Sequence, residues 1–250
     1  MDVPSISVIT VSYNAVTSIE KTMLSVLNQI YDRVEYIIID GGSVDGTLEV
    51  IQKYVDRLGY WVSEPDKGIY DAMNKGILNA SGDWIIFMNC GDIFVDDNVL
   101  YSLFFGKKYE NVDVLYGDAL EVDSNGRKRL LKARDFKSNN IPPAYRHGAS
   151  FVRREIHKTF LFDLSRYDLF SYGLDYDCIC RMCRANKSFK YCNIIIMEYL
   201  KDGISNHPLK NIWLRKLIEH NGNKGISFYK DLLFYFPCGI YRRLKRFITK

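Results

Sequence analysis

The sequence contains four polar segments whose side chains could bind a metal ion or a phosphate group. In one of them, Asp92 follows Gly91 directly after an apolar run. A hard cation such as Mg²⁺ or Mn²⁺ takes carboxylate oxygens together with diphosphate oxygens and water, so one or two carboxylates suffice. Gly91 permits a close approach of the ligand to the backbone. For Asp92 alone, the alternative is a turn aspartate bonded to its own backbone; the three other segments favour the metal site.

Asp40 ends a second apolar run, in the segment Ile-Ile-Ile-Asp-Gly-Gly-Ser. An acidic residue at a strand end can accept hydrogen bonds from a base N–H or a ribose hydroxyl, as in dinucleotide-binding sheets. Gly41 would let such a ligand close in on the chain. A turn or helix-capping role is the alternative, and the residues leave both open. No GxGxxG motif follows the first apolar run, which argues against a dehydrogenase.

Asp66 and Lys67 lie just before a predicted helix that begins near Gly68. Helix N-termini and lysine side chains both favour phosphate. Three polar residues follow at helical spacing, and we expect them to belong to the same binding site: Asp71, Asn74 and Lys75. The alternative is a solvated helix face with an ion pair between Asp71 and Lys75.

The elements that would position these residues alternate between strand and helix. The first half predicts strands over 5–12, 34–39, 60–62 and 84–88. It also predicts a helix from Thr17, with Glu20 in capping-box spacing, and helices over 46–58 and 69–80. This alternation indicates an α/β fold with a mostly parallel central sheet flanked by helices. Ligands bind outside the carboxyl ends of such strands, so the four polar segments at these ends, 12–14, 40–43, 64–67 and 89–92, should form one crevice.

The second half of the chain is less regular. Strands are predicted over 112–116, 127–132, 148–152 and 193–198, and a helix over 175–185. We therefore expect one domain over 1–205, with a ligand-binding half at 1–105 and a second half at 106–205. Residues 206–250 would form a helical extension.

Composition excludes several classes of protein. Hydrophobic residues make up 47% of the 250 residues, enough for one sizeable core, and charged residues make up 26%, so wholesale disorder is not expected. The net charge of +4 does not indicate a nucleic-acid partner. No stretch reaches the roughly 18–20 apolar residues of a spanning helix. The N-terminus lacks the pattern of a signal peptide. We expect a cytoplasmic protein whose six cysteines are reduced. Cys178, Cys180 and Cys183 are expected to be small apolar core residues, with a metal cluster as the alternative.

The C-terminal segment 226–250 is basic and amphipathic. After Gly239, apolar residues share one helical face, and arginines and lysines lie mostly elsewhere. This pattern is typical of a helix that lies on an anionic membrane surface. We expect peripheral contact with the cytoplasmic face of the inner membrane; packing on the domain or on a second subunit of a homo-oligomer is the alternative.

Four ordered motifs of the first half resemble glycosyltransferase family 2, and in particular its bacterial surface-polysaccharide branch with colanic-acid, capsule and O-antigen enzymes. They are Ser7-Val-Ile-Thr-Val-Ser-Tyr-Asn14, Glu35-Tyr-Ile-Ile-Ile-Asp-Gly-Gly-Ser-Val-Asp-Gly-Thr47, Ser63-Glu-Pro-Asp-Lys-Gly-Ile-Tyr-Asp-Ala-Met-Asn-Lys-Gly76 and Phe87-Met-Asn-Cys-Gly-Asp92. The resemblance is dense over 5–95, weaker to about 205 and absent beyond. It implies the GT-A fold of nucleotide-diphospho-sugar transferases.

The resemblance also implies roles for individual residues. The nucleoside would be held by the first strand end and by the aspartate after the second strand, which here are Thr10, Tyr13, Asn14 and Asp40. Asp66 and Lys67 match the donor-binding segment. Asp92 matches the last aspartate of the family's Asp-x-Asp metal motif, so Mn²⁺ or Mg²⁺ is implied. The first aspartate of that motif is replaced by Asn89, which leaves one carboxylate fewer for the metal.

In the second half, Gly173-Leu-Asp-Tyr-Asp-Cys-Ile-Cys-Arg181 fits the family's catalytic carboxylate before a helix. This points to Asp175 as the base, with Asp177 as the runner-up on the acceptor side. The alternative for both is a carboxylate that interacts with the helix dipole. His147 resembles the acceptor-side histidine of a His-Gln-Ala run, with glycine in place of glutamine.

The implied reaction is an inverting transfer of a sugar from a nucleotide-diphospho-sugar to a hydroxyl of a glycan, here expected to be lipid-linked, in bacterial surface-polysaccharide biosynthesis. Asp175 would take the proton of the attacking hydroxyl, while Asp92 would hold the cation that neutralises the leaving diphosphate. Two rivals are weighed. A nucleotidyltransferase would want a glycine-rich, basic loop after the first strand, which the segment 11–15 does not offer. A non-enzymatic nucleotide-sugar or glycan-binding module would not need Asp92 and Asp175 together.

Overall fold

The computed structural model describes residues 3–134, 143–201 and 208–231. The strands are β1 (Ile6–Ser12), β2 (Val34–Asp40), β3 (Tyr60–Ser63), β4 (Trp84–Phe87), β5 (Ile93–Phe94), β6 (Val114–Val122), β7 (Lys128–Leu131), β8 (Ser150–Arg153) and β9 (Phe189–Leu200). The α-helices are α1 (Ile19–Leu27), α2 (Thr47–Gln52), α3 (Ile69–Asn79), α4 (Val99–Phe104), α5 (Arg154–Thr159), α6 (Tyr167–Phe170), α7 (Leu174–Arg184) and α8 (Pro208–Glu219). Short 3₁₀ helices are η1 (Val55–Arg57), η2 (His147–Ala149), η3 (Leu164–Arg166) and η4 (Ser171–Gly173).

The strands form a single mixed sheet in the order β3-β2-β1-β4-β8-β6-β9-β5, with β7 paired to β6. The first four strands along the chain are parallel to one another, as the sequence predicted. Beyond them β8 runs antiparallel to both β4 and β6, and β9 runs parallel to β6. The expectation of a mostly parallel sheet therefore describes the first half, and the sheet as a whole is mixed. Both halves of the chain contribute strands to this one sheet.

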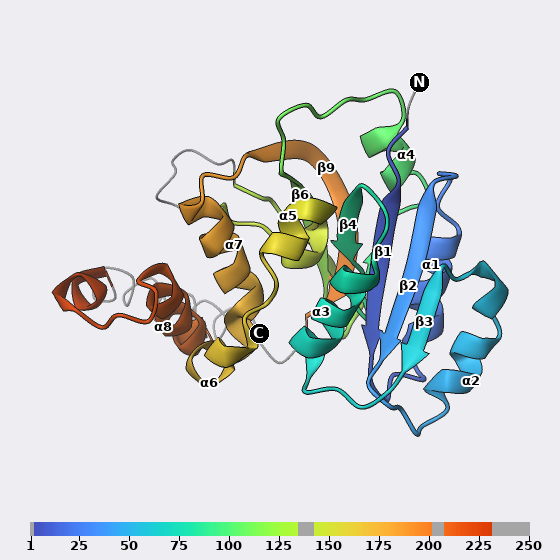
Figure 1. Cartoon of the computed structure of the whole chain (residues 1–250), viewed down its shortest axis with the longest axis horizontal. Helices are drawn as coiled ribbons and strands as arrows, with labels where there is room; N and C mark the ends of the chain where they lie inside the picture. The colour runs from blue at the N-terminus through green and yellow to red at the C-terminus, as the bar shows by residue number, and fades with distance from the viewer. Residues whose placement is uncertain (1–2, 135–142, 202–207, 232–250) are drawn as a thin grey trace.

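Two apolar layers cover the two faces of this sheet. Along β1, Ile6 and Val8 belong to the layer that contains α1 and α4, and Ile9 and Val11 belong to the layer with α3, α7 and α8. This alternation follows from the two-residue period of a strand. Because both faces are covered, β1 is buried at every position, which is why it appears in the sequence as an uninterrupted β-rich run. Figure 1 shows α7 and α8 at the opposite end of the molecule from α2.

Two helices of the first half differ from the prediction at their ends. The helix expected over 46–58 is α2 followed by the 3₁₀ turn η1, because Lys53 and Tyr54 bond to carbonyls three residues back and tighten the chain. The capping box expected at Thr17 is not formed. Helix α1 begins after Ser18 without a side-chain cap, and the Glu20 carboxylate instead accepts a hydrogen bond from the Tyr54 hydroxyl at 2.9 Å.

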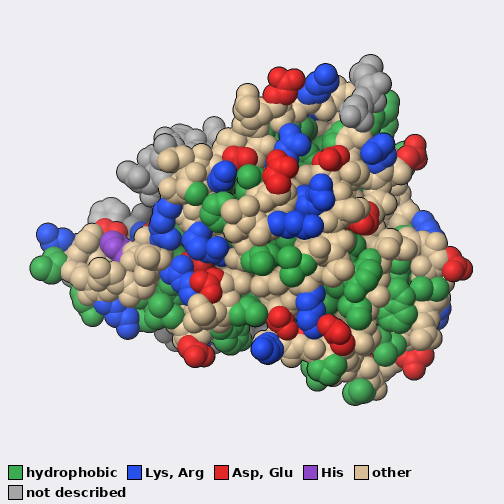
Figure 2. Space-filling model, in the orientation of Figure 1, with side chains coloured by type: hydrophobic (Ala, Val, Ile, Leu, Met, Phe, Trp, Pro, Cys, Tyr) green, Lys and Arg blue, Asp and Glu red, His purple; other side chains and the backbone are tan. Residues whose placement is uncertain are grey.

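Three of the five described cysteines are buried in the core, while Cys90 and Cys192 are half-buried. Cys178, Cys180 and Cys183 are buried in α7, while Cys238 and most of the basic segment 226–250 lie outside the described residues. Within the described ranges, no helix is long and apolar enough to cross a membrane. On the face shown in Figure 2, acidic and basic side chains are interspersed.

Candidate active site

Asp40 lies at the last position of β2, where the sheet register places it between Ser12 of β1 and Ser63 of β3. Both serine hydroxyls donate to its carboxylate, at 2.8 and 2.7 Å. The Ser43 hydroxyl and the backbone N–H groups of Gly42 and Ser43 donate as well. Burial acts to raise the pKa of Asp40, but the hydrogen bonds outweigh it and lower that pKa. The carboxylate is fully buried and fixes the loop after β2.

The other residues predicted to hold a nucleoside differ in their exposure. Thr10 is fully buried, and its hydroxyl donates to the Met88 carbonyl at 2.7 Å. Asn14 adopts a left-handed backbone with φ of 46°, and its side-chain oxygen accepts from the Val44 N–H at 3.0 Å. Tyr13 is 66% exposed. Tyr13 and Asn14 are therefore both exposed and can offer a surface to a ligand, while Thr10 lies in the core beneath them.

The loop after β2 meets the loop after β3 at Gly41. A Cβ atom at this position would lie 2.6 Å from an Asp66 carboxylate oxygen and 3.3 Å from the Tyr13 ring. Glycine is therefore required for the two loops to approach one another. Asp66 in turn accepts a hydrogen bond from the Gly68 N–H at 2.8 Å, at the start of α3.

Two polar residues of α3, Asp71 and Lys75, are held by contacts with the loop after β3. The backbone N–H of Lys67 donates to the Asp71 carboxylate at 3.0 Å, and the Lys67 side chain extends to solvent. Lys75 forms its ion pair with Glu64, at 2.6 Å. The alternative interpretation of this face expected an ion pair between Lys75 and Asp71. In the structure Lys75 pairs with Glu64 instead, because the loop after β3 brings Glu64 over the helix.

Asn74 joins α3 to the second half of the chain. Its side-chain nitrogen donates to the Phe162 carbonyl at 2.8 Å, and its side-chain oxygen accepts from the Phe162 N–H at 2.9 Å. The sequence predicted a donor-binding role for this residue. In the structure both ends of the amide are committed to Phe162, so Asn74 holds two elements together.

The turn after β4 presents Asp92. Gly91 has a φ of 94°, and no atom lies within 4 Å of where its Cβ would be. Its N–H donates to the Thr22 hydroxyl at 3.0 Å, and that hydroxyl donates to the Asp92 carbonyl at 2.8 Å. The turn is thus fixed to α1 through Thr22. Burial raises the pKa of the Asp92 carboxyl to about 7, although the nearby Arg146 acts to lower it.

The oxygen atoms of this turn fit a hard divalent cation, with few protein ligands. Among the described residues, no group of three or more His, Cys, Asp or Glu side chains could enclose a metal. The turn does offer the Asp92 carboxylate and the side-chain oxygen of Asn89, which is buried without a hydrogen-bond partner. Mg²⁺ and Mn²⁺ accept such a partial set when substrate phosphates and water supply the remaining ligands.

Asp175 lies in the first turn of α7. One carboxylate oxygen accepts from the Tyr176 N–H at 2.8 Å and lies 3.5 Å from the Tyr70 hydroxyl of α3. Burial raises the pKa of Asp175 above its ordinary value, while the Tyr176 N–H and the Arg146 charge act against the rise. A carboxylate whose pKa is raised toward neutrality is better suited to accept a proton in catalysis.

Asp177, the second carboxylate of α7, is fully buried. It forms ion pairs with Arg166 and Arg181, both at 3.0 Å. These contacts tie η3 to α7, so the carboxylate has partners on both sides and no access to a substrate. The structure therefore gives Asp177 a packing role, and of the two α7 carboxylates it places Asp175 toward α3.

His147 begins η2 and packs among aromatic rings. Its ring stacks on Phe87 at a centroid distance of 5.5 Å and meets Phe162 edge-on at 5.6 Å. Burial lowers the pKa of His147 to about 4. The imidazole is thus neutral at neutral pH.

Arg146 is a charged residue of the site that the sequence reasoning missed. Its guanidinium lies 4.0 Å from the centre of the Tyr199 ring of β9, and the Tyr199 hydroxyl donates to Glu121 at 3.1 Å. Its charge acts on the carboxyl groups of both Asp92 and Asp175 and opposes the rise that burial causes in the pKa of each. The one available signal was a basic residue directly before His147.

Shared neighbours bring the three candidate carboxylates into one region. The Cys90 thiol has a pKa raised to about 12, first by burial and then by the charges of Asp40 and Asp92. Asp92 and Asp175 in turn share Arg146. These shared neighbours link three carboxylates that are far apart in sequence to one region of the structure, in which Asp40 is fully buried.

Comparison with known families and proteins gives a consistent result. Residues 7–168 match the model of a family described as Glycosyl transferase family 2. An uncharacterized glycosyltransferase of Haemophilus influenzae is 35% identical over 190 residues, which cover 70% of this chain and 72% of that protein. An uncharacterized glycosyltransferase of Mycobacterium tuberculosis is 44% identical over 98 residues. That match covers 39% of this chain and only 37% of the length of the mycobacterial protein.

Two solved structures resemble this one in fold. The S. aureus TarS fragment 1–349 in complex with UDP-GlcNAc has a TM-score of 0.62 at 17% identity, over 90% of this chain and 69% of that one. A mannosyltransferase from Pyrobaculum calidifontis in complex with GDP-Man and Mn²⁺ has a TM-score of 0.65 at 14% identity, over 94% of this chain and 69% of that one. At these identities the likeness concerns the fold alone.

Proposed function

The chain belongs to glycosyl transferase family 2 and is a glycosyltransferase of the GT-A fold, and on this premise we propose that it transfers a sugar from a nucleotide-diphosphate donor to a hydroxyl of a glycan, with inversion at the anomeric carbon. The proposal rests on one observation above all. Two carboxyl groups with raised pKa values, Asp92 and Asp175, both lie within reach of the positive charge of the exposed residue Arg146.

The donor would lie over the loops that follow β1, β2 and β3. Tyr13 offers an exposed ring to the base, while Asp40 holds the loop beneath it from a buried position. Arg146 is an exposed cation with no ion-pair partner among the described residues, and a diphosphate would give it one. A donor of this class is supported by the like-folded proteins, whose solved complexes contain UDP-GlcNAc and GDP-Man.

A divalent cation, Mn²⁺ or Mg²⁺, would be held by the Asp92 carboxylate and the orphaned Asn89 oxygen. When bound, it would supply positive charge for the diphosphate that leaves. Arg146 adds a second positive charge to the same cleft. One carboxylate of the family's metal motif is replaced by Asn89. We therefore propose that neutralisation of the diphosphate depends more on Arg146 here than it would in an enzyme with two metal-binding carboxylates.

Asp175 would act as the base. The acceptor oxygen forms the new bond to the anomeric carbon, its proton passes to the Asp175 carboxylate, and the bond from the anomeric carbon to the diphosphate breaks. The anomeric configuration inverts because attack and departure occur on opposite faces. Tyr70 lies 3.5 Å from the same carboxylate and helps to orient it.

For the biological role, we propose bacterial surface-polysaccharide biosynthesis with a lipid-linked acceptor. The support is the pattern of the four sequence motifs and the basic, amphipathic segment 226–250, which would rest on an anionic membrane. Most of that segment, 232–250, lies outside the described residues. Liposome flotation with and without the segment after Gly225 tests the membrane contact; equal binding by both chains would contradict it.

The proposed activity can be tested with purified chain, MnCl₂ and a panel of UDP-GlcNAc, UDP-glucose, dTDP-glucose and GDP-mannose. We expect one donor to raise the melting temperature and to be hydrolysed slowly, with release of nucleoside diphosphate. Asp92→Ala and Asp175→Asn should each reduce the turnover by about a hundredfold or more. The matched control is Asp97→Ala, an exposed aspartate soon after the same turn. No stabilisation and no hydrolysis with any donor would contradict the proposal.

A further inference from the structure

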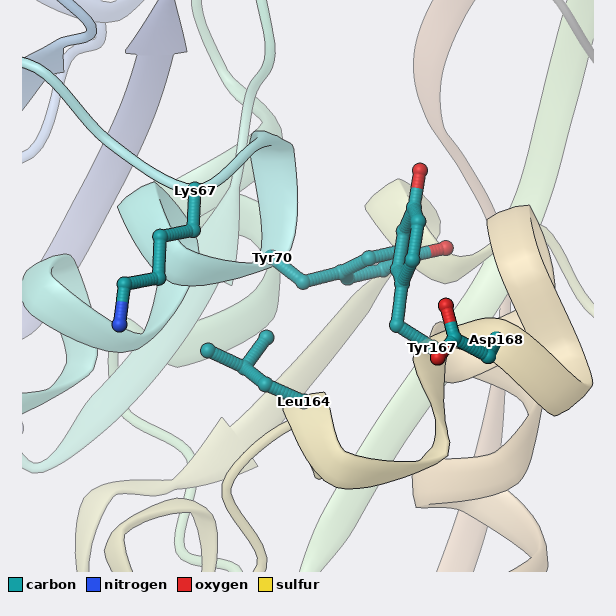
Figure 3. Close-up of a pocket in the computed structure, with 5 residues that line it drawn as sticks. All are labelled: Lys67, Tyr70, Leu164, Tyr167 and Asp168. Atoms are coloured by element: carbon teal, nitrogen blue, oxygen red, sulfur yellow. The ribbon is translucent and has the colours of Figure 1, made fainter.

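A small open pocket separates the start of α3 from the 3₁₀ turn η3 and helix α6. It encloses about 240 Å³, which suits one ring-sized group better than a whole nucleotide sugar. Figure 3 shows its five lining residues. Lys67 and Tyr70 form one wall, and Leu164, Tyr167 and Asp168 form the other. Since the walls come from the two halves of the chain, an occupant would contact both.

The lining has the chemistry of a saccharide site. Tyr167 is 47% exposed, so much of its ring is open to solvent, and Leu164 adds further apolar surface. The Asp168 carboxylate and the Lys67 ammonium are exposed, and neither has an ion-pair partner within the described ranges. A pyranose ring has an apolar C–H face for an aromatic side chain and a rim of hydroxyls for an acceptor and a donor.

The position of the pocket distinguishes acceptor from donor. Tyr70, part of its wall, places its hydroxyl 3.5 Å from the Asp175 carboxylate and donates to the Tyr172 carbonyl at 2.7 Å. The pocket therefore adjoins the proposed base. Lys67, which the sequence predicted for the donor, does line the pocket, but neither Asp92 nor Arg146, which would face the donor diphosphate, contributes to its lining.

We propose that this pocket is a subsite for a neutral hexopyranose unit of the acceptor glycan. The sugar stacks on Tyr167, its hydroxyls bond to Asp168 and Lys67, and its receiving hydroxyl points past Tyr70 to Asp175. A neutral sugar fits because the lining carries one carboxylate and one ammonium, so the pocket has no net charge for a charged sugar to neutralise. This inference rests on the proposed function, since it gives the acceptor of that reaction its binding site.

Saturation-transfer NMR on the full chain tests the subsite. The probes are the methyl pyranosides of glucose, galactose and mannose, with UDP and MnCl₂ present. We expect ring-proton saturation for at least one probe. Tyr167→Ala should weaken the affinity about tenfold, and Asp168→Asn should weaken it in the same direction. The control is Tyr101→Ala, which removes a ring of similar exposure (42%) from α4 and should leave the affinity unchanged.

Three outcomes would overturn the subsite: no saturation with any probe, equal saturation in wild type and Tyr167→Ala, or displacement of the probe when the matching UDP-sugar replaces UDP. The last would make the pocket the donor sugar's. Donor binding is followed separately by thermal shift. Donor stabilisation without probe binding counts against the subsite alone, and probe binding that is lost in Tyr167→Ala supports the subsite even if every donor fails.

Discussion

Arg146 is an exposed cation whose charge reaches the carboxyl groups of both Asp92 and Asp175. Its position is set by a cation–π contact with Tyr199. The guanidinium lies over the Tyr199 ring, and the ring is anchored because its hydroxyl bonds to Glu121, which also pairs with Arg129 at 2.8 Å. A cation held in this way remains available to an anion, because a ring face satisfies it only in part.

Replacement of Arg146 should change both the affinity for UDP and the pH dependence of kcat. We expect Arg146→Ala to weaken UDP affinity about tenfold or more, because a charge-assisted contact is lost, and Arg146→Lys to recover part of it. The pKa of Asp175 should also rise, since the arginine acts to lower it. A base must be deprotonated to work, so the acid limb of the kcat profile should move to higher pH. Isothermal titration and a pH series measure the two effects.

Arg127→Ala is the control, because Arg127 is exposed in the turn between β6 and β7. Arg127→Ala should change neither the UDP affinity nor the acid limb of the kcat profile. If Arg146→Ala binds UDP as well as wild type and keeps the same acid limb, the guanidinium does not face the donor.

The carboxylate of Asp92 should lower the free energy of unfolding of the metal-free protein at neutral pH. Burial raises its pKa from 3.8 to about 7, so the folded state holds the proton more tightly than the unfolded state. The stability contribution therefore falls as pH rises from about 4 to 7, by at most about 4 kcal/mol. We expect Asp92→Asn to be more stable than wild type in urea with EDTA, with a larger gain at pH 8 than at pH 5, while donor turnover is lost.

An equal gain at both pH values would show that the carboxylate is not buried as the structure has it. Asp97→Asn, on an exposed aspartate, should show no pH-dependent gain.

The sequence indicated Asp40 and Asp92 as site residues, but it could not distinguish their environments. Asp40 follows a buried strand just as Asp92 follows another. What separates them is tertiary: hydroxyls from β1, β3 and the loop after β2 converge on Asp40 and lower its pKa, while Asp92 has no such neighbours and its pKa rises. Contacts between strands that are far apart along the chain leave no local signal.

At the scale of elements, the alternation up to residue 88 was predictable because β1, β2 and β4 are largely buried apolar runs separated by amphipathic helices, whereas the short elements β5 and α4 that follow were not predicted. The second half was not predictable in this way. Strand β9 extends over 189–200, whereas only 193–198 was predicted, because its first part is polar and half-exposed and bends at Asn193, where φ is 50°. Helix α5 was missed because six residues with four charged or histidine side chains carry no apolar period.

Helix α3 depends on Asn74 for its contact with the second half. We expect Asn74→Ala to lower the free energy of unfolding by about 2–3 kcal/mol, because the backbone N–H and C=O of Phe162 would both lose their partner. Urea denaturation measures this. The matched control is Asn79→Ala on the same helix, whose side chain donates only to the Lys75 carbonyl at an exposed position and should cost little. Equal losses in the two variants would mean that the Asn74 bridge contributes nothing specific.

At the scale of the whole molecule, α8 bears on where the domain ends. The sequence motifs fade near residue 205, so we expected the extension to begin at 206. In the structure Leu214, Leu217 and Ile218 of α8 lie in the same buried layer as α3 and α7. A Cβ on Gly173 would lie 2.8 Å from the Ile218 side chain, so the start of α7 fits closely against this helix. We propose that α8 stabilises the helix that carries Asp175.

This proposal predicts the response to one core substitution. Leu217 is fully buried, so Leu217→Ala should cost about 2–5 kcal/mol and leave a cavity against α7. If α8 and the sheet form one cooperative unit, circular dichroism and tryptophan fluorescence should report the same single transition, shifted to lower urea. Leu78→Ala, on a side chain 57% exposed, is the control and should change little. An early separate transition in the variant, with the main one unmoved, would make α8 an independent appendage and remove its support for Asp175.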